Sequence, residues 1–197
     1  ALLQLASAPA QASLKTTVAI AWLRQGQEDK FRASIDEALK AKADHVPALI
    51  ELVRASAQRG NIDEALAGLD KIPRQSSGAD EAHKLRGDLL LYGKRDMDAA
   101  MVAYREALQV NPSYLEGQAA VVQLLLLQGK TEAAAEALQR LAKAAPGKPQ
   151  TLYLQAMLAY AKNDLKAAQE HAQKLVSLTP ENFRALELAG MTELRLG

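Results

Sequence analysis

Few side chains in this sequence are of types that could do chemistry, and their spacing matches none of the common reactions. His45, His83 and His171 are each dozens of residues from one another, whereas the zinc ligands of a helix or a short loop lie about four residues apart. The serines of RQSSGAD, residues 74–80, have no paired histidine and aspartate that would activate a nucleophile. We therefore predict no catalytic residue, no metal site and no cofactor, and the chain is predicted not to be an enzyme.

The composition excludes several classes of partner. Lys plus Arg number 24 and Asp plus Glu number 23, so the formal net charge is +1 and no overall field favours nucleic acid. The sequence has no cysteine, and therefore no disulfide and no thiolate metal site. No run approaches the ~18 apolar residues of a membrane-spanning helix. We expect neither a nucleic-acid partner nor a direct membrane span.

The distribution of charge indicates a binding surface instead. Two segments of equal length, 117–129 and 149–161, carry no charged side chain. Residues 80–88 and 184–195, which occupy related places in the sequence, carry several. Because exposed helix faces usually carry charges, the pattern predicts a neutral strip between charged flanks.

Three side chains of the second neutral segment could form a contact surface. Tyr153, Met157 and Tyr160 are spaced i, i+4 and i+7, so they share one face of a helix. Tyrosine and methionine suit adaptable contact with another protein. Ordinary packing between neighbouring helices is the alternative interpretation of the same pattern.

The elements that carry these residues are predicted to be helices of a repeated unit. Hydrophobic residues make up 49% of the chain but aromatic residues only 4%, so Ala and Leu dominate, and both favour helix. Pro112, Pro146 and Pro180 recur at a constant interval of thirty-four positions, and Pro9 precedes Pro112 by three such periods and one residue. Because proline ends one helix and can begin the next, we predict a two-helix unit of this length, with one extra residue near Gly93.

Small residues follow the same period. A tight turn between antiparallel helices needs a residue with positive φ, which glycine adopts without strain and asparagine tolerates. The turn positions are assigned to Gly26, Gly60, Gly93, Gly129, Asn163 and Gly197. On each second helix a small residue precedes bulkier buried ones, at Ala65, Ala100, Ala134 and Ala168, while Phe31 departs from this rule. In the second unit, Pro73 and residues 74–80 are predicted to end the helix early. A helical bundle without repeats is the alternative.

These small-residue and proline positions, with Gly87 in LRGDLLL and Gly190 in LAGMTEL, resemble tetratricopeptide repeats. The resemblance implies an all-α fold, a right-handed superhelical solenoid of antiparallel helix pairs whose first helices line a concave groove. The expected organisation is a single array over residues 1–197, comprising the end of a preceding repeat (1–11), repeats at 12–45, 46–79, 80–114, 115–148 and 149–182, and the first helix of a sixth repeat (183–197). Because both terminal units are partial, we expect a piece of a longer protein.

The resemblance also implies a function in binding a protein or peptide partner. Seven residues are expected to face the groove: Tyr92, Leu126, Leu127, Tyr153, Met157, Tyr160 and Met191. We predict a non-catalytic interaction scaffold. One alternative is the substrate-recognition arm of a larger enzyme, such as a glycosyltransferase. Another is self-association through the apolar segments ALLQLA and LELAGM at the two ends.

A narrower resemblance concerns the phrases LRGDLLLYG and AVVQLLLLQGKTEAAAEALQRL. They are similar to long bacterial tetratricopeptide repeat proteins, including lipoproteins associated with exosortase (PEP-CTERM) sorting. This resemblance implies a bacterial periplasmic or envelope protein that serves export or sorting, and a cytoplasmic location is the alternative.

Overall fold

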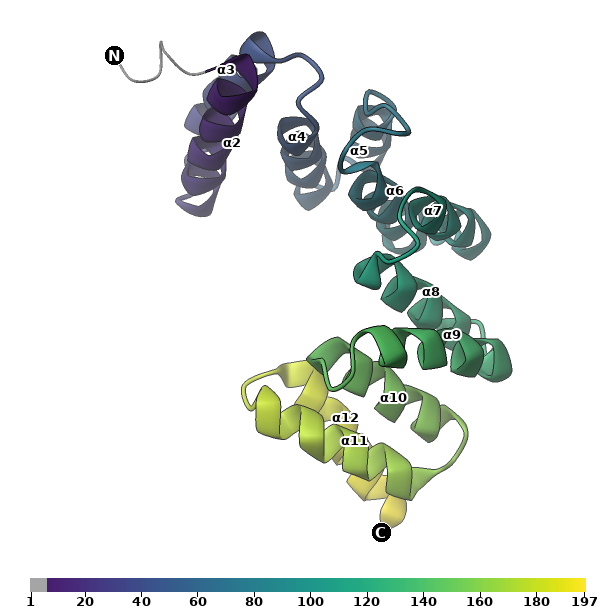
Figure 1. The fold of residues 1–197 in the computed structure, drawn as a ribbon. Helices are drawn as coiled ribbons and strands as arrows, with labels where there is room; N and C mark the ends of the chain where they lie inside the picture. Colours follow the sequence, from purple (N-terminus) through teal and green to yellow (C-terminus); the bar gives the residue numbers. More distant parts are fainter. Residues whose placement is uncertain (1–6) are drawn as a thin grey trace. The chain divides into compact units, whose positions relative to one another are not determined.

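The computed structural model of the chain describes residues 7–197, and all regular elements in this range are helices. The chain forms two compact units, residues 1–110 and 111–197, which are described separately below. The first unit contains α2 (Ala8–Arg24), α3 (Glu28–Ala41), α4 (Val46–Gln58), α5 (Ile62–Leu69), α6 (Ala79–Asp88), the π-helix η1 (Leu89–Gly93) and α7 (Met97–Val110). The second contains α8 (Leu115–Leu127), α9 (Thr131–Ala144), α10 (Pro149–Ala161), α11 (Leu165–Leu178) and α12 (Phe183–Leu196). The predicted all-helical fold is confirmed (Figure 1).

Consecutive helices pack as antiparallel pairs within each unit. In the first unit α2 packs on α3, α4 on α5, and α6 on α7, while in the second α8 packs on α9 and α10 on α11. Turns of three residues join the members of each pair, and in the α6–α7 pair the turn follows η1, which continues α6. The repeat unit is therefore a helical hairpin, as the constant interval between the prolines predicts.

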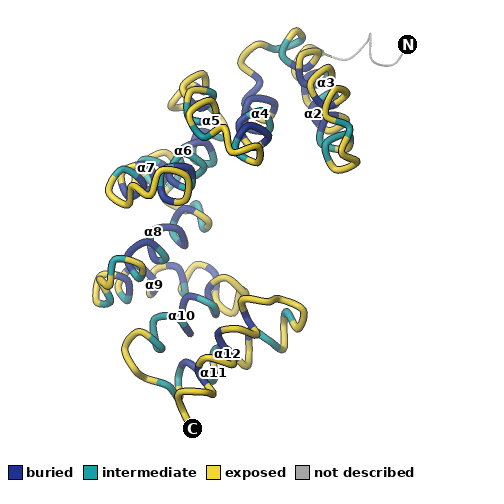
Figure 2. The backbone as a smooth tube through the Cα atoms, turned by 180° about the vertical axis from the view of Figure 1, so that it is seen from behind, coloured by how far each residue is buried: buried dark blue, intermediate teal, exposed yellow. Residues whose placement is uncertain are grey.

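The predicted stripe on the second helices forms the core of the hairpins. The small residues Ala65, Ala100, Ala134 and Ala168 are all fully buried. Phe31, which departs from the small-residue rule, is also fully buried. Buried residues recur along every helix, separated by intermediate or exposed residues (Figure 2). Because the hairpins touch along these faces, burial of the stripe is what holds neighbouring helices together.

The middle residue of every three-residue turn has a positive φ. This holds for Gly26 (71°), Gly60 (81°), Gly129 (69°) and Asn163 (61°). In the turn that joins η1 to α7, however, the middle residue is Arg95, with φ of 58°. The assignment of Gly93 to this position was therefore wrong.

The π-helix explains why the turn is displaced. In regular turns of this chain, the amide N after the positive-φ residue bonds a carbonyl five residues back, as Asn61 N does to Ser56 O at 3.0 Å. In the third turn Asp96 N bonds Leu90 O, six residues back, at 2.9 Å. The wider π-helical turn thus holds the extra residue of this repeat inside the helix. Gly93 ends that helix, where a Cβ would lie 2.8 Å from Ile62 Cγ2.

Helix α2 begins at Ala8, four residues before the predicted start of the first repeat at residue 12. Pro9 lies at the start of this helix, where its missing N–H costs nothing because the first-turn N–H groups have no intrahelical partner. Of the predicted preceding repeat, residues 1–6 lie outside the described residues, and residues 8–11 belong to α2. The other repeat boundaries stay predictions.

Helix α5 ends early, as Pro73 predicted. It has 8 residues, whereas α3, α7, α9 and α11 each have 14. The chain continues through turns between residues 70 and 78, in which Ser76 N donates to Pro73 O at 3.0 Å. Gly78, with φ of 90°, immediately precedes α6. In residues 7–197, no helix combines the length and the apolar character needed to cross a membrane.

Candidate functional site

The predicted contact residues of the second unit lie on its first helices, α8, α10 and α12. Helix α10 contacts both α8 and α12, so it is the central helix of this face. Pro149 occupies the first turn of α10, and the Asn182 side chain accepts a hydrogen bond from Ala185 N at 3.2 Å to cap α12. The sequence thus fixes the starts of the two helices that carry most of the predicted residues. We call Leu126, Leu127, Tyr153, Met157, Tyr160 and Met191 the apolar face.

Tyr153 and Met157 are partly buried in the packing between α10, α11 and α12. The Tyr153 side chain packs against two core clusters, one containing Leu152 and one containing Leu188. Met157 packs against the second of these clusters. For these two residues the structure therefore supports a packing role, and their remaining exposed surface is available for contact.

Tyr160 has a different environment. The Arg195 guanidinium carbon lies 4.9 Å from the centroid of the Tyr160 ring, a cation–π distance. The same guanidinium donates a hydrogen bond from Nη2 to Asn163 Oδ1 at 2.7 Å. Asn163 is the positive-φ residue of the turn after α10, so a fixed turn orients the arginine and the arginine in turn orients the ring.

The edges of the apolar face are open to solvent. Leu127 on α8 is 48% exposed and Met191 on α12 is 44% exposed, whereas Leu126 is partly buried. The seventh predicted residue, Tyr92, lies on η1 in the first unit and is 62% exposed. The structure therefore groups six of the seven residues on the helices of one unit.

Two of the three helices that carry the apolar face have almost no charge, whereas the third, α12, carries Arg184, Glu187, Glu193 and Arg195. Helix α10 has no charged residue, and in α8 the only one is Glu116, in the first turn. Lys162, in the turn after α10, pairs with Glu132 at 2.9 Å between Nζ and Oε1. The part of this surface on α8 and α10 is therefore nearly uncharged, while α12 adds charged side chains, among them Arg195 over the Tyr160 ring. Sequence analysis missed Arg195, although it follows Tyr160 by one period and one residue.

The three histidines lie in separate environments. Burial lowers the pKa of His45, with a smaller contribution from Lys42, and burial likewise lowers the pKa of His171. His83 Nδ1 lies 3.1 Å from Glu106 Oε2. Over the described range, residues 7–197, no group of three or more His, Cys, Asp or Glu side chains is arranged to hold a metal ion.

Comparison with protein families decides the relationship that the helical hairpins suggest. One family model described as tetratricopeptide repeat matches residues 23–89 and 91–158, and a second with the same description matches residues 153–197. The chain belongs to the tetratricopeptide repeat (TPR) family. No curated protein matches this TPR chain significantly.

Several solved TPR structures are similar to this one in fold. A thermophilic TPR protein from Thermus thermophilus is 16% identical, with a TM-score of 0.73 over 93% of this chain and 99% of that one. PilW, described as a widely conserved type IV pilus biogenesis factor, is 20% identical, with a TM-score of 0.72 over 94% and 91%. YrrB, described as a TPR protein with an unusual peptide-binding site, is 17% identical, with a TM-score of 0.59 over 88% and 89%.

TPR proteins are in general non-catalytic scaffolds that bind protein or peptide partners. Their hairpins present long, regular surfaces rather than an enclosed site, and this suits contact with extended partners.

Proposed function

We propose that this TPR protein binds a segment of a partner protein on the apolar face of its second unit. The observation that carries the proposal is the ring of Tyr160 on α10, a helix without charged residues, which the Arg195 guanidinium holds in place. An oriented aromatic ring loses little conformational entropy on binding, because the contact with Arg195 already restricts it.

The chemistry of the face indicates what the partner segment would carry. Leu127 and Met191 offer exposed apolar surface, which favours aliphatic or aromatic side chains in the partner. Arg195 offers guanidinium N–H donors, which favour a carbonyl or carboxylate group next to those side chains. YrrB, a TPR protein of similar fold, has a peptide-binding site, and this supports a ligand of this kind.

A peptide library displayed on phage and selected against the purified chain tests this proposal. We expect selected peptides to bind the Tyr160→Ala and Met191→Ala double variant about tenfold or more weakly, because aromatic anchors in interfaces often contribute ~2 kcal/mol. The matched control is Leu178→Ala, which removes a side chain that is 56% exposed on α11, a second helix. Equal binding to wild type and the double variant would remove the proposal.

Tyr153→Ala is a less specific variant. Because Tyr153 packs against two core clusters, its removal also weakens the contacts of α10 with α11 and α12. The combination of Tyr153→Ala with Tyr160→Ala therefore needs a circular dichroism measurement, and the variant is informative only if its helicity equals that of wild type.

We further propose an envelope role in export or sorting, which rests on the narrower bacterial resemblance in sequence. PilW, which is similar in fold, is a type IV pilus biogenesis factor, and this supports such a role. Fractionation of cells that produce the full-length protein tests it, since recovery in the cytoplasm alone would contradict an envelope location. Self-association through the terminal segments stays a prediction, and sedimentation velocity at several protein concentrations tests it.

A further inference from the structure

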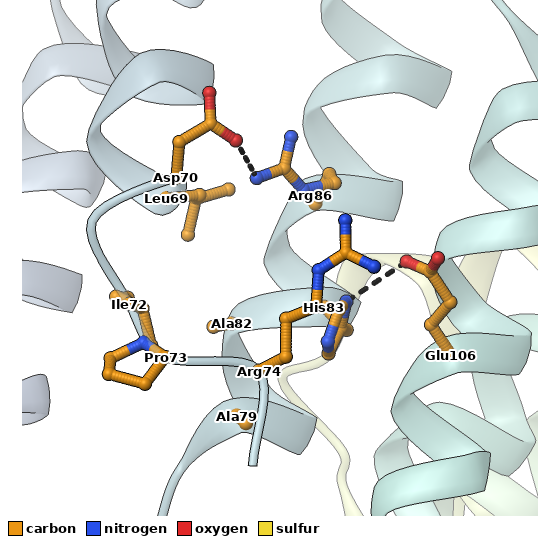
Figure 3. Close-up of a pocket in the computed structure, with 10 residues that line it drawn as sticks. All are labelled: Leu69, Asp70, Ile72, Pro73, Arg74, Ala79, Ala82, His83, Arg86 and Glu106. Carbon is orange, nitrogen blue, oxygen red and sulfur yellow. Dashed lines mark hydrogen bonds and ion pairs between the residues drawn. The ribbon is translucent and has the colours of Figure 1, made fainter. Parts of the chain in front are cut away.

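The shortened helix α5 leaves a cleft in the first unit. Because α5 ends at Leu69 instead of continuing for 14 residues as the other second helices do, no helical turn covers the neighbouring surfaces of α6 and α7. The cleft has a volume of about 500 Å³, within the range of small-ligand sites. Its walls come from residues 69–74, α6 and α7 (Figure 3).

Four nearly buried apolar side chains form the floor of the cleft, and polar side chains make up most of its exposed lining. Leu69 and Ile72 line it from the end of α5 and the following turn, and they are 3% and 6% exposed. Ala79 and Ala82 line it from α6 and are also buried. Each of these four side chains exposes little surface, so an aliphatic side chain placed here gains only a small apolar contact.

The walls carry five polar side chains, and four of them form two pairs. Arg86 Nη2 donates to Asp70 Oδ1 at 2.6 Å. His83 Nδ1 lies 3.1 Å from Glu106 Oε2, but in a geometry that leaves this buried nitrogen without a hydrogen bond. Arg74, on the turn after Pro73, has no ion pair or hydrogen bond to any residue in the described part of the chain. Figure 3 shows its guanidinium beside His83 in the cleft.

We propose that this cleft binds a peptide through a carboxylate, with a neighbouring aliphatic side chain as a secondary contact. The free Arg74 guanidinium can donate two parallel hydrogen bonds to a carboxylate, and the aliphatic side chain makes the smaller contact with the floor. A phosphate dianion fits less well, because Asp70 and Glu106 line the same cleft and repel additional negative charge. This site lies in the first unit and does not depend on the apolar face of the second.

Small probes in nuclear magnetic resonance titrations of the whole chain test the proposal. N-acetyl-L-leucine carries a terminal carboxylate and an isobutyl group, and N-acetyl-L-leucinamide is its uncharged counterpart. We expect N-acetyl-L-leucine to shift the amide signals of residues that line the cleft and the amide probe to leave them unchanged. The blocked dipeptide acetyl-Glu-Leu-amide offers only a side-chain carboxylate, so it distinguishes a side-chain ligand from a chain terminus.

Two arginine variants complete the test. Arg74→Gln removes the free cation and is expected to weaken binding of the carboxylate probe about tenfold, the effect of losing a charge-assisted hydrogen bond. Arg105→Gln is the matched control, because Arg105 is exposed on α7, next to Glu106, and does not line the cleft. The proposal is overturned if none of the carboxylate probes shifts these signals, if the uncharged probe shifts them equally, or if Arg74→Gln binds like wild type.

Discussion

The aromatic ring of Tyr104 on α7 lies against the Cα atom of Gly87 on α6. A Cβ atom built on Gly87 would lie 2.3 Å from Tyr104 Cε1, far inside contact distance. The Tyr104 hydroxyl donates a hydrogen bond to Asp88 Oδ1 at 2.9 Å, and burial, followed by the charge of Asp88, raises the pKa of Tyr104 so that the hydroxyl stays protonated. The glycine therefore provides the space in which the second helix packs on the first.

Gly87→Ala is expected to destabilise the chain by about 1–3 kcal/mol. The added methyl group overpacks the contact with Tyr104, and this cost exceeds the gain of up to ~1 kcal/mol from replacing glycine within a helix. Urea unfolding of the two proteins measures the difference. Gly190→Ala is the matched control, because a Cβ at Gly190 on α12 meets nothing within 4 Å, and it is expected to stabilise. If both variants are stabilised, the close packing of Tyr104 on Gly87 is refuted.

Arg95→Gly is expected to stabilise the chain by about 0.5–1 kcal/mol. Arg95 has φ of 58°, and a residue with a Cβ is strained there by ~1–2 kcal/mol, which the greater flexibility of glycine in the unfolded chain partly offsets. Thermal unfolding measures the change. Gly60→Ala is the reverse control, since Gly60 has φ of 81° and open space around it, and it is expected to destabilise. A loss of stability in Arg95→Gly would argue against this turn geometry.

Ala134→Leu is expected to cost about 1–3 kcal/mol, because Ala134 on α9 is fully buried and the larger side chain must displace its neighbours. Ala133→Leu, one residue earlier and exposed, is expected to leave stability nearly unchanged. Denaturant unfolding curves of the two variants give the comparison. Similar stabilities would mean that the predicted stripe does not mark the contact between helices.

The free energy of unfolding is expected to decrease as the pH falls below about 6.5, the ordinary pKa of histidine. Burial lowers the pKa of His45 in the folded chain. As the pH falls, the unfolded chain therefore binds a proton at this histidine before the folded chain does, and protonation stabilises the unfolded state relative to the folded one. Lys42 acts in the same direction and Asp44 opposes it. Urea unfolding at about pH 7.5 and 5.5 tests this effect. His45→Gln should show a smaller loss on acidification than wild type, and an equal loss would exclude His45 as the cause.

The repeat positions could be predicted from the sequence because they follow from local physical needs. Turns that need a positive φ favour glycine, as at Gly26, Gly60 and Gly129, and close contact between helices favours alanine, as at Ala100 and Ala134. The regular spacing of these residues therefore predicts the helical hairpins. Gly93 was misplaced because spacing alone does not distinguish a glycine at the end of a π-helix from one in a turn. Only the hydrogen bonds of that segment identify Arg95 as the turn residue.

The cleft of the first unit could be predicted only in part. Pro73 indicated that a helix ends early, but not which side chains the missing turns leave uncovered. Asp70, His83 and Glu106 come from three different segments, and their approach depends on how α6 and α7 pack. The partial burial of Tyr153 could likewise not be predicted from its place on a helix face, because one face can serve both packing and contact.

The four methionines of the chain allow the most direct test of binding on the apolar face. Met157 and Met191 lie on that face, whereas Met97 and Met101 lie on α7 in the first unit. A selected peptide that carries a nitroxide label is added to protein labelled with ¹³C at the methionine methyl groups, and line broadening is recorded. We predict broadening of the Met157 and Met191 signals, with the Met97 and Met101 signals unchanged. Broadening confined to Met97 and Met101, or absent from all four, would contradict binding at the apolar face.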